Sequence, residues 1–361
     1  MFIKKAKPID PTETPIAHST FNEFFLSESL KQNIAKKGYV KPTPIQDQAI
    51  SPILKNKDLM GTASTGTGKT AAFLIPIIDK IYKNKKDKAI IITPTRELAV
   101  QINDELKNLS FNMGIYSTVV IGGENIRNQI RCLQRNSQVV IGTPGRIKDL
   151  LKRNALSLKN FSIFVLDEVD MMVDIGFIQD IKYFISLLPQ VRQSLFFSAT
   201  IPPKVQELLK TFVKNPITIS LKKQDTSENV DQNIVRVINK NKKIEQLHEL
   251  LIKDGFDKVL IFGRTKHEIE RLNKELISRG FKSGSIHGNK SQGQRQRVLQ
   301  NFKKNNLQIL LATDVASRGI DIDSVTHVIN YDLPQTYEDY IHRIGRTGRA
   351  NKKGVALTFI D

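Results

Sequence analysis

The sequence has almost no cysteine, no tryptophan and few histidines. Of its 361 residues, one is cysteine and six are histidine. A lone cysteine excludes a disulfide within the chain, and no histidines pair at metal-ligand spacing, so a zinc site is not supported. Cys132 falls in a helical pattern with Arg127, Arg131 and Arg135 at four-residue intervals. We expect it to pack inside the protein rather than act as a nucleophile.

Long apolar runs are also missing. No stretch approaches the roughly 20 apolar residues that a membrane-spanning helix needs. Residues 1–20 contain lysines, prolines and polar residues but no apolar signal core. We therefore expect a flexible N-terminal lead-in over residues 1–20 and a cytoplasmic protein.

Acidic residues are scarce relative to basic ones. The chain has 36 Asp and Glu against 55 Lys and Arg, which gives a formal charge of +19. Such an excess favours a polyanionic partner. The alternative is that runs such as Lys83 to Lys88 and Lys240 to Lys243 are solvated loop residues that only aid solubility.

The first half of the chain alternates short apolar runs with stretches of helical length, such as Thr95 to Leu109. The runs are continuously apolar, as strands of a parallel sheet covered on both faces should be. They predict a doubly wound α/β domain with strands at residues 89–93, 117–121, 138–142, 161–166 and 194–198.

The same pattern restarts in the second half. Strands are predicted at residues 258–262, 283–286, 309–312, 327–330 and 355–359, and helices at 267–279 and 292–304. A polar segment without a core-facing period separates the halves. We therefore predict domains at residues 21–220 and 231–361, a linker at 221–230, and a ligand-binding cleft between the domains.

A segment between an apolar stretch and a helix-forming run has the composition of a phosphate-binding loop. It consists of Ala63, Ser64, Thr65, Gly66, Thr67, Gly68, Lys69 and Thr70. The glycines let backbone N–H groups point inward, the lysine can reach the terminal phosphates, and the last hydroxyl can ligate Mg²⁺. Alanine stands where the general pattern has its first glycine, so a chance loop is the alternative. Alone, the segment predicts only that a nucleotide is bound.

Two adjacent carboxylates follow the apolar run at 161–166. Asp167 is placed to hold Mg²⁺ through water, and Glu168 can orient and deprotonate an attacking water. A helix N-terminus that favours acidic residues would account for one carboxylate but not for the pair after a phosphate loop. The pair therefore predicts catalysis.

Three arginines recur at three-residue intervals near the C-terminus: Arg343, Arg346 and Arg349. Guanidinium groups suit phosphate oxygens, and across a cleft they can neutralise charge that develops on a γ-phosphoryl group. A basic patch that only grips a nucleic-acid backbone is the alternative. A cleft between two domains favours the arginine-finger interpretation.

These segments together resemble the DEAD-box ATP-dependent RNA helicases, from about Phe21 to the end of the chain. Nine motifs occur in the family's order: residues 38–46, 63–70, 94–99, 122–123, 143–146, 167–170, 198–200, 312–321 and 342–349. The resemblance implies two RecA-like domains with the active site in the cleft between them. Ala63 is the residue that this family carries at the start of its phosphate loop.

The resemblance also implies roles for residues that spacing alone would not single out. Gln46 would pair with the adenine edge, Tyr39 would offer a stacking face, and Asp321 would hold the ribose. Residues that link the nucleotide site to the domain interface would be Asp170, Ser198, Thr200 and His342. RNA contacts would come from Pro94, Thr95, Arg96, Gly123, Thr143 and Arg146, and from Thr265, Gln292, Arg295 and Thr313.

The departures from the family pattern are small. Val169 stands where alanine is usual, and Arg264 where many members have asparagine. Val169 adds no functional group, so we expect it to change the packing behind the acid pair rather than the chemistry. The segments 264–267 and 287–292 resemble the bacterial RhlE-type branch. The chain ends at Asp361, so we expect that a basic tail recruiting a particular RNA is absent or was removed.

The sequence predicts an RNA-stimulated ATPase that uses Mg²⁺ and separates short RNA duplexes locally, with little base specificity. We expect a monomer without a membrane partner. Partners in ribonucleoprotein remodelling, RNA degradation or ribosome assembly are not readable from the sequence. One alternative is a non-catalytic, ATP-gated RNA clamp, which should have lost a catalytic residue. The other is a DNA-directed helicase of the wider superfamily, against which the segment around Gln46 argues.

Overall fold

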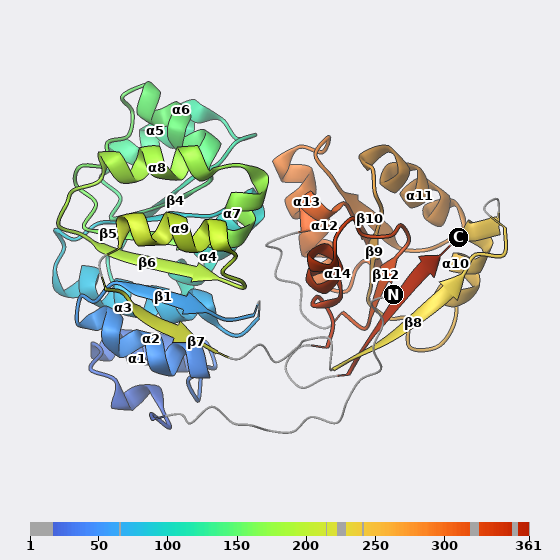
Figure 1. Ribbon diagram of the computed structural model, residues 1–361, viewed down its shortest axis with the longest axis horizontal. Helices are drawn as coiled ribbons and strands as arrows, with labels where there is room; N and C mark the ends of the chain where they lie inside the picture. Colours follow the sequence, from blue (N-terminus) through green and yellow to red (C-terminus); the bar gives the residue numbers. More distant parts are fainter. Residues whose placement is uncertain are drawn as a thin grey trace. The chain divides into compact units, whose positions relative to one another are not determined.

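The computed structural model describes residues 17–64, 66–213, 215–221, 229–239, 242–317, 325–348 and 353–360. Within these residues the chain divides into two compact units: an N-terminal unit that ends at Leu221 and a C-terminal unit that begins at Asn229 (Figure 1). Most of the predicted linker lies outside the described residues. The exact domain boundaries therefore stay a prediction.

The N-terminal unit is built on a seven-stranded sheet in which every neighbouring pair is parallel, with the order β3-β4-β2-β5-β6-β1-β7. The strands are β1 (Leu59–Thr62), β2 (Ala89–Ile92), β3 (Ser117–Val120), β4 (Val139–Gly142), β5 (Ile163–Asp167), β6 (Gln193–Ser198) and β7 (Ile217–Ser220).

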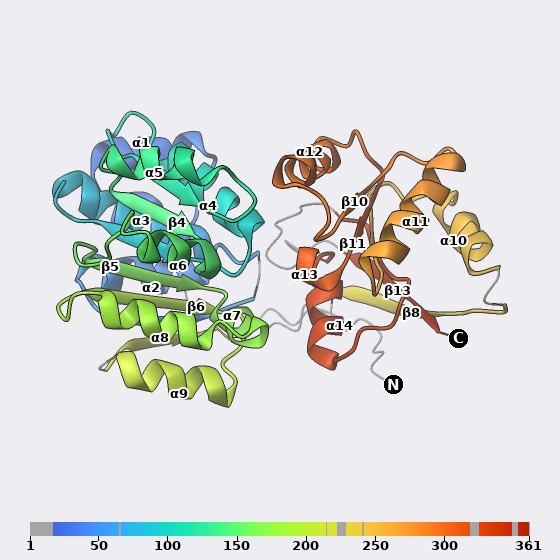
Figure 2. The ribbon, with the colours of Figure 1, turned by 90° about the horizontal axis from the view of Figure 1, so that it is seen from above.

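Helices cover both faces of this sheet (Figures 1 and 2). They are α1 (Glu28–Lys36), α2 (Pro44–Leu54), α3 (Lys69–Lys83), α4 (Arg96–Leu109), α5 (Ile126–Gln134), α6 (Pro144–Lys152), α7 (Val169–Ile175), α8 (Ile178–Leu187) and α9 (Pro203–Phe212), after a short 3₁₀ turn at Phe21–Glu23. Strand β2 is continuously apolar because side chains on both of its faces are buried. Ile91 packs with α1 to α4 on one face, whereas Ile90 and Ile92 pack with α6 to α9 on the other.

The C-terminal unit has a six-stranded, wholly parallel sheet with the order β10-β11-β9-β12-β13-β8. Its strands are β8 (Val230–Arg236), β9 (Val259–Phe262), β10 (Ser283–Ile286), β11 (Ile309–Ala312), β12 (His327–Asn330) and β13 (Gly354–Ile360). Its helices are α10 (Lys243–Leu251), α11 (Lys266–Ser278), α12 (Gln292–Lys303), α13 (Asp314–Ser317) and α14 (Tyr337–Ile344). In the described residues no helix combines the length and apolar character that a bilayer-spanning segment requires.

The predicted α/β class is confirmed, and each predicted strand is present within about two residues of its expected ends. Strand β1 was anticipated only as the apolar stretch before the phosphate loop, and the two edge strands β7 and β8 were not predicted. Strand β7 is mostly exposed, and β8 contains the polar residues Asp231, Gln232 and Asn233. An edge strand pairs on one side only, so neither has the continuous apolarity by which the central strands are found.

Candidate active site

Apart from the segment with Tyr39 and Gln46, which precedes β1, the predicted site segments of the N-terminal unit follow the carboxyl ends of its parallel strands. The phosphate loop follows β1, Pro94 to Arg96 follow β2, Thr143 follows β4, and the acid pair lies at the end of β5. Parallel strands present their carboxyl ends at one edge of the sheet, where ligands of such folds bind. The topology thus places the nucleotide and RNA candidates of this unit along the same edge.

The phosphate loop curls back on itself between β1 and α3. Gly66 and Gly68 have φ angles of +83° and +92°, which glycine adopts without steric cost. Lys69 is the first residue of α3, is 7% exposed, and donates from Nζ to the carbonyl oxygen of Ala63 at 2.9 Å. Thr67 closes the loop further by donating to the Ser64 carbonyl at 2.8 Å. Thr65 lies outside the described residues.

Gln46 lies directly against this loop. Its Oε1 accepts from the backbone N–H of Thr43 at 2.9 Å, and its Nε2 donates to the carbonyl oxygen of Gly68 at 3.2 Å. The side chain is 4% exposed. A carboxamide has two donor hydrogens and two acceptor lone pairs, so one of each remains for a base edge. Gln46 therefore ties the expected adenine site to the phosphate loop.

Replacing Gly68 with alanine should disrupt both parts of this arrangement. A Cβ there would collide with Gln46 Nε2 and lie 3.1 Å from Thr43 Oγ1, and the left-handed φ adds about 1–2 kcal/mol of strain. We expect Gly68→Ala to weaken ATP binding at least about tenfold. Gly145→Ala is the control, since its Cβ meets nothing within 4 Å. Equal ATP affinity of the two variants, measured by titration calorimetry, would contradict this reading.

Tyr39, which the sequence predicts as a stacking face for adenine, makes contacts within the protein. Its hydroxyl donates to Glu105 Oε1 at 2.6 Å, and its ring stacks on Phe21 with centroids 6.2 Å apart. These contacts anchor the ring to α4 and to the start of the unit. Stacking of adenine on Tyr39 stays a prediction.

The acid pair lies at the junction of β5 and α7. Asp167 is 3% exposed, and its Oδ1 accepts from the N–H of Glu168 at 3.0 Å. Burial raises the pKa of Asp167 to about 6, an effect that the nearby Lys69 ammonium partly opposes. Glu168 has a left-handed φ of +55°, which is uncommon for a residue with a Cβ. Strain of this kind clusters at functional sites.

Asp167 should make the ligand-free protein less stable as pH rises. Because its pKa of about 6 exceeds the ordinary 3.8, the folded state binds the proton more tightly between those values. The free energy of unfolding therefore falls across this window, by about 3 kcal/mol in total. With nucleotide absent and metal chelated, Asp167→Asn should melt above the wild type at pH 7, and the gap should close near pH 4.

The matched control for this experiment is Asp104→Asn, at an exposed position on α4 without a partner in the described residues. It should leave the melting temperature unchanged at both pH values. An Asp167→Asn variant that melts at or below the wild-type temperature at pH 7 would show that the ionised carboxylate is not costly.

Asp170 binds the loop that follows β6. Its Oδ2 accepts from the N–H groups of Ala199 and Thr200 at 3.2 and 2.8 Å and from Thr200 Oγ1 at 2.9 Å. Ser198 Oγ in turn accepts from the N–H of Asp170 at 3.2 Å and donates to the Thr200 carbonyl at 2.6 Å. The structure thus joins three of the four predicted coupling residues in one network. Their coupling role stays a prediction.

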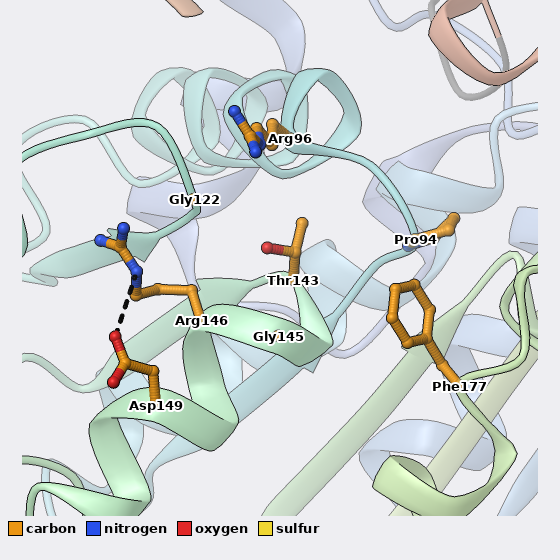
Figure 3. Close-up of a pocket in the computed structure, with 8 residues that line it drawn as sticks. All are labelled: Pro94, Arg96, Gly122, Thr143, Gly145, Arg146, Asp149 and Phe177. Carbon is orange, nitrogen blue, oxygen red and sulfur yellow. Dashed lines mark ion pairs between the residues drawn. The ribbon is translucent and has the colours of Figure 1, made fainter. Parts of the chain in front are cut away.

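A pocket of about 360 Å³ lies beside this edge (Figure 3). The predicted RNA contacts Pro94, Arg96, Thr143 and Arg146 line it, together with Gly122, Gly145, Asp149 and Phe177. Thr95 caps α4 by accepting from the N–H of Leu98, and Gly123 is exposed with a φ of +81°.

The two arginines enter this pocket from different elements (Figure 3). The Arg96 guanidinium crosses Gly122 so closely that a Cβ there would lie 3.0 Å from Nη2. Arg146 donates from Nη1 to the Glu124 carbonyl at 3.1 Å and to Gln129 Oε1 at 2.9 Å. Burial lowers the pKa of Arg146, and the charge of Arg96 lowers it further. Asp149, whose Oδ2 lies 4.0 Å from Arg146 Nε, opposes this lowering and offsets one of the two positive charges (Figure 3). The remaining positive charge favours an anion such as a phosphate.

The predicted RNA residues of the C-terminal unit also follow strand ends. Thr265 caps α11 by accepting from the N–H of Glu268 at 3.2 Å, and Thr313 follows β11. Gln292 and Arg295 lie on the first turn of α12 and are 0% and 9% exposed. Their side chains are therefore largely inside the unit.

Arg343 has a structural role that the sequence did not reveal. It donates to both carboxylate oxygens of Asp314, at 2.6 and 2.8 Å, and to the Asp332 carbonyl at 2.6 Å. It is 2% exposed and lies over the Phe262 ring. This fork fastens α14 to the turn that carries Thr313. The three-residue arginine spacing was the available signal, but it did not say which arginine points inward.

Arg346 lies just beyond α14 and is 4% exposed, and His342 lies within α14 and is half-buried. Asp321 and Arg349 lie outside the described residues. The expectation that Cys132 packs inside the protein is wrong, because the side chain is exposed on α5. There Ile126, Ile130 and Leu133 take the core-facing positions instead.

Two comparisons of sequence identify the family. Residues 43–208 match the DEAD/DEAH box helicase family, and residues 240–351 match the helicase conserved C-terminal domain. The ATP-dependent RNA helicase CshA of Limosilactobacillus reuteri is 45% identical over 94% of this chain and 69% of its own length. The DEAD-box ATP-dependent RNA helicase CshA of Bacillus cereus strain ATCC 10987 is 43% identical over 95% of this chain and 65% of its own. The chain thus spans about two thirds of these curated relatives.

A solved structure gives the same result for the fold. S. cerevisiae Dbp5 bound to RNA and ADP BeF3 aligns with a TM-score of 0.85 and 32% identity, over 95% of this chain and 90% of Dbp5. Both units therefore have the parallel α/β architecture of the RecA-like helicase domains. This chain belongs to the DEAD-box family of ATP-dependent RNA helicases.

Proposed function

We propose that this chain couples RNA-stimulated ATP hydrolysis to local separation of short RNA duplexes. The observation that carries the proposal is the single sheet edge that bears the phosphate loop, the acid pair and the arginine-lined pocket. The Asp170 network joins α7, which directly follows the acid pair, to the loop after β6. Binding or hydrolysis of the nucleotide could therefore shift the loop after β6 through these hydrogen bonds.

For the nucleotide, we propose that Gln46 reads adenine with its remaining donor and acceptor, and that the loop over residues 63–70 holds the phosphates. Lys69 would exchange its bond to the Ala63 carbonyl for phosphate oxygens. Thr70 and Asp167 are the proposed Mg²⁺ ligands. The fit is good because an ionised carboxylate buried at 3% exposure is costly without a cation. When bound, Mg²⁺ supplies positive charge to the phosphates.

For the chemistry, we propose that Glu168 orients a water for attack on the γ-phosphorus and accepts its proton. The P–O bond to the β-phosphate breaks, and ADP and phosphate leave. Arg346 and Arg349 would stabilise the charge on the transferring group once the two units close on ATP and RNA. Asp321 would hold the ribose, and His342 would link the units.

For RNA, we propose that the pocket of the N-terminal unit binds the sugar-phosphate backbone through Arg96, Arg146 and the neighbouring backbone groups. Thr265, Gln292, Arg295 and Thr313 would add contacts from the second unit. The bound strand would be bent so that a duplex partner cannot follow, and phosphate loss would release it. Contacts of this kind carry little sequence information.

The experiment is a comparison of steady-state ATPase rates with single-stranded RNA, with single-stranded DNA of equal length, and without nucleic acid. The proposal expects a large stimulation by RNA and little by DNA. Equal stimulation by both would favour the DNA-directed alternative. Binding of ATP and RNA without turnover would favour the clamp, and either result would overturn the proposal.

The narrower placement within the family stays a prediction. The sequence resembles the RhlE-type branch, whereas the relatives reported above carry the name CshA. We also propose that the chain acts as a monomer in the cytoplasm. Its physiological RNA should be sought with a panel of structured ribosomal and messenger fragments in the same ATPase assay.

A further inference from the structure

Helix α5 has an unusual charge pattern. Among the α-helices of the described residues, α5 and α12 are the two without any Asp or Glu. Helix α12 carries Gln292 and Arg295, which are proposed RNA contacts. Helix α5 carries none of the residues assigned above, although it begins just after the exposed Gly123.

The basic side chains of α5 form one exposed stripe. Ile126, Ile130 and Leu133 pack against the core, whereas Arg127, Arg131 and Arg135 are exposed. We call these three arginines the α5 stripe. They recur every four residues, a rise of about 6 Å per step along a helix. Within the described part of the chain, their guanidinium groups have no hydrogen-bond or ion-pair partner.

A solvated helix face commonly mixes charges of both signs, and other helices here do so. On α11, Glu275 pairs with Arg279, and on α6, Asp149 pairs with Arg153. Three unpaired like charges on one face repel one another instead. Such a face is suited to neutralisation by a polyanion.

The stripe begins beside the RNA pocket. Gln129 of α5 is 7% exposed and donates to the Ile121 carbonyl at 2.9 Å. Its Oε1 accepts from Arg146, which lines the pocket, at 2.9 Å. The first turn of α5 is therefore fixed directly to a proposed RNA-binding side chain.

We propose that the α5 stripe binds the phosphate backbone of RNA that extends beyond the pocket at one end of the bound strand. The proposal rests on the proposed function, because it assumes that the pocket binds RNA. Guanidinium groups recognise phosphates without reading bases, so this extension is sequence-blind. The stripe would thus lengthen the RNA-binding surface of the N-terminal unit. It would favour RNA substrates in which the bound strand continues beyond the pocket at that end.

The test compares three variants of the full chain. The first replaces the three stripe arginines with glutamine, and the second replaces them with lysine. The control replaces Lys36, Lys86 and Lys107 with glutamine, since these are exposed lysines of the same unit without a described side-chain partner. Fluorescence anisotropy gives the affinity for the shortest RNA that fully stimulates the ATPase, and for the same RNA extended at its 5′ or 3′ end.

We expect the wild type to gain affinity from one extension only. The glutamine variant should lose that gain in affinity, which is about tenfold. The slope of its log affinity against log salt concentration should be shallower by about 2, the value for three phosphates of a single strand. The lysine variant should keep most of the gain, and the control all of it. The ATPase rate at saturating short RNA should be the same in all four proteins.

Cys132 provides a second readout, because it is the only cysteine and lies exposed between Arg131 and Arg135. The effective extension should slow its alkylation by iodoacetamide, and the short RNA should not. An unchanged affinity of the glutamine variant for both extended RNAs would overturn the proposal, as would an equal loss in the control. If short RNA fails to stimulate the ATPase, the proposed function fails, whereas extended-RNA binding without nucleotide still tests the stripe.

Discussion

Glu168→Gln will bind ATP and RNA with nearly wild-type affinity and will hydrolyse ATP about 10²–10⁴ times more slowly at saturating RNA. The amide keeps the size and shape of the side chain at the β5–α7 junction but cannot accept the proton of the attacking water. The Glu168 backbone carbonyl accepts the first α7 hydrogen bond, from the N–H of Met172 at 3.1 Å, and the substitution leaves this bond in place. The measurement is a single-turnover rate with RNA in excess.

Two further variants separate the chemistry from the fold. Glu28→Gln changes an exposed glutamate on α1 in the same way and should keep the wild-type rate. Glu168→Gly should relieve the strain of the +55° φ while abolishing turnover. Near-normal hydrolysis by Glu168→Gln would show that another group is the base.

Arg346→Gln will lose about 10³–10⁵ in RNA-stimulated turnover, the usual loss when an arginine finger is absent. Arg346→Lys should recover only a small part of the rate, because an ammonium keeps the charge but not the two-pronged contact with phosphate oxygens. Both variants should retain the RNA-independent ATP affinity of the wild type, since our assignment places the nucleotide on the N-terminal unit. Stopped-flow phosphate release measures the rate.

Arg343 provides the matched comparison, because it lies three residues away and is equally buried. Its fork to Asp314 is structural, so Arg343→Gln should lower the free energy of unfolding by roughly 3 kcal/mol. Substitutions at these two arginines of one motif should therefore have different effects: those at Arg346 should lower turnover, and those at Arg343 should lower thermal stability. A large stability loss in Arg346→Lys, with turnover kept, would reverse the two assignments.

The sequence predicted the parts of the molecule that local pattern controls. The central strand β11 is buried on both faces and reads as a continuous apolar run, so it was located to the residue. Strands β10 and β12 were also located to the residue, although their sequences include polar residues. The edge strand β8 was missed because only two of its seven residues are buried, so it has no continuous apolar run. Cys132 was wrongly predicted to be buried. The arginine spacing indicated a helix but did not show which face of that helix packs against the core, and the face with Ile126, Ile130 and Leu133 does so instead.

Long-range contacts could not be predicted in the same way. The bond from Gln46 to Gly68 spans 22 residues, and the bonds from Asp170 to Thr200 span 30. The first depends on how α2 packs beside the phosphate loop, and the second on β5 and β6 being neighbours in the sheet. Motif order indicated that these residues act together, but only the fold shows the atoms through which they meet.

The central claim is that ATP and RNA together close the two units and complete the active site. Single-molecule fluorescence transfer tests it most directly, in a Cys132→Ser background with dyes at Lys152→Cys and Lys274→Cys, both exposed positions. We predict one high-transfer state that appears only with RNA and a non-hydrolysable ATP analogue together. The same high-transfer state with either ligand alone, or its absence under conditions where RNA stimulates hydrolysis, would contradict the account.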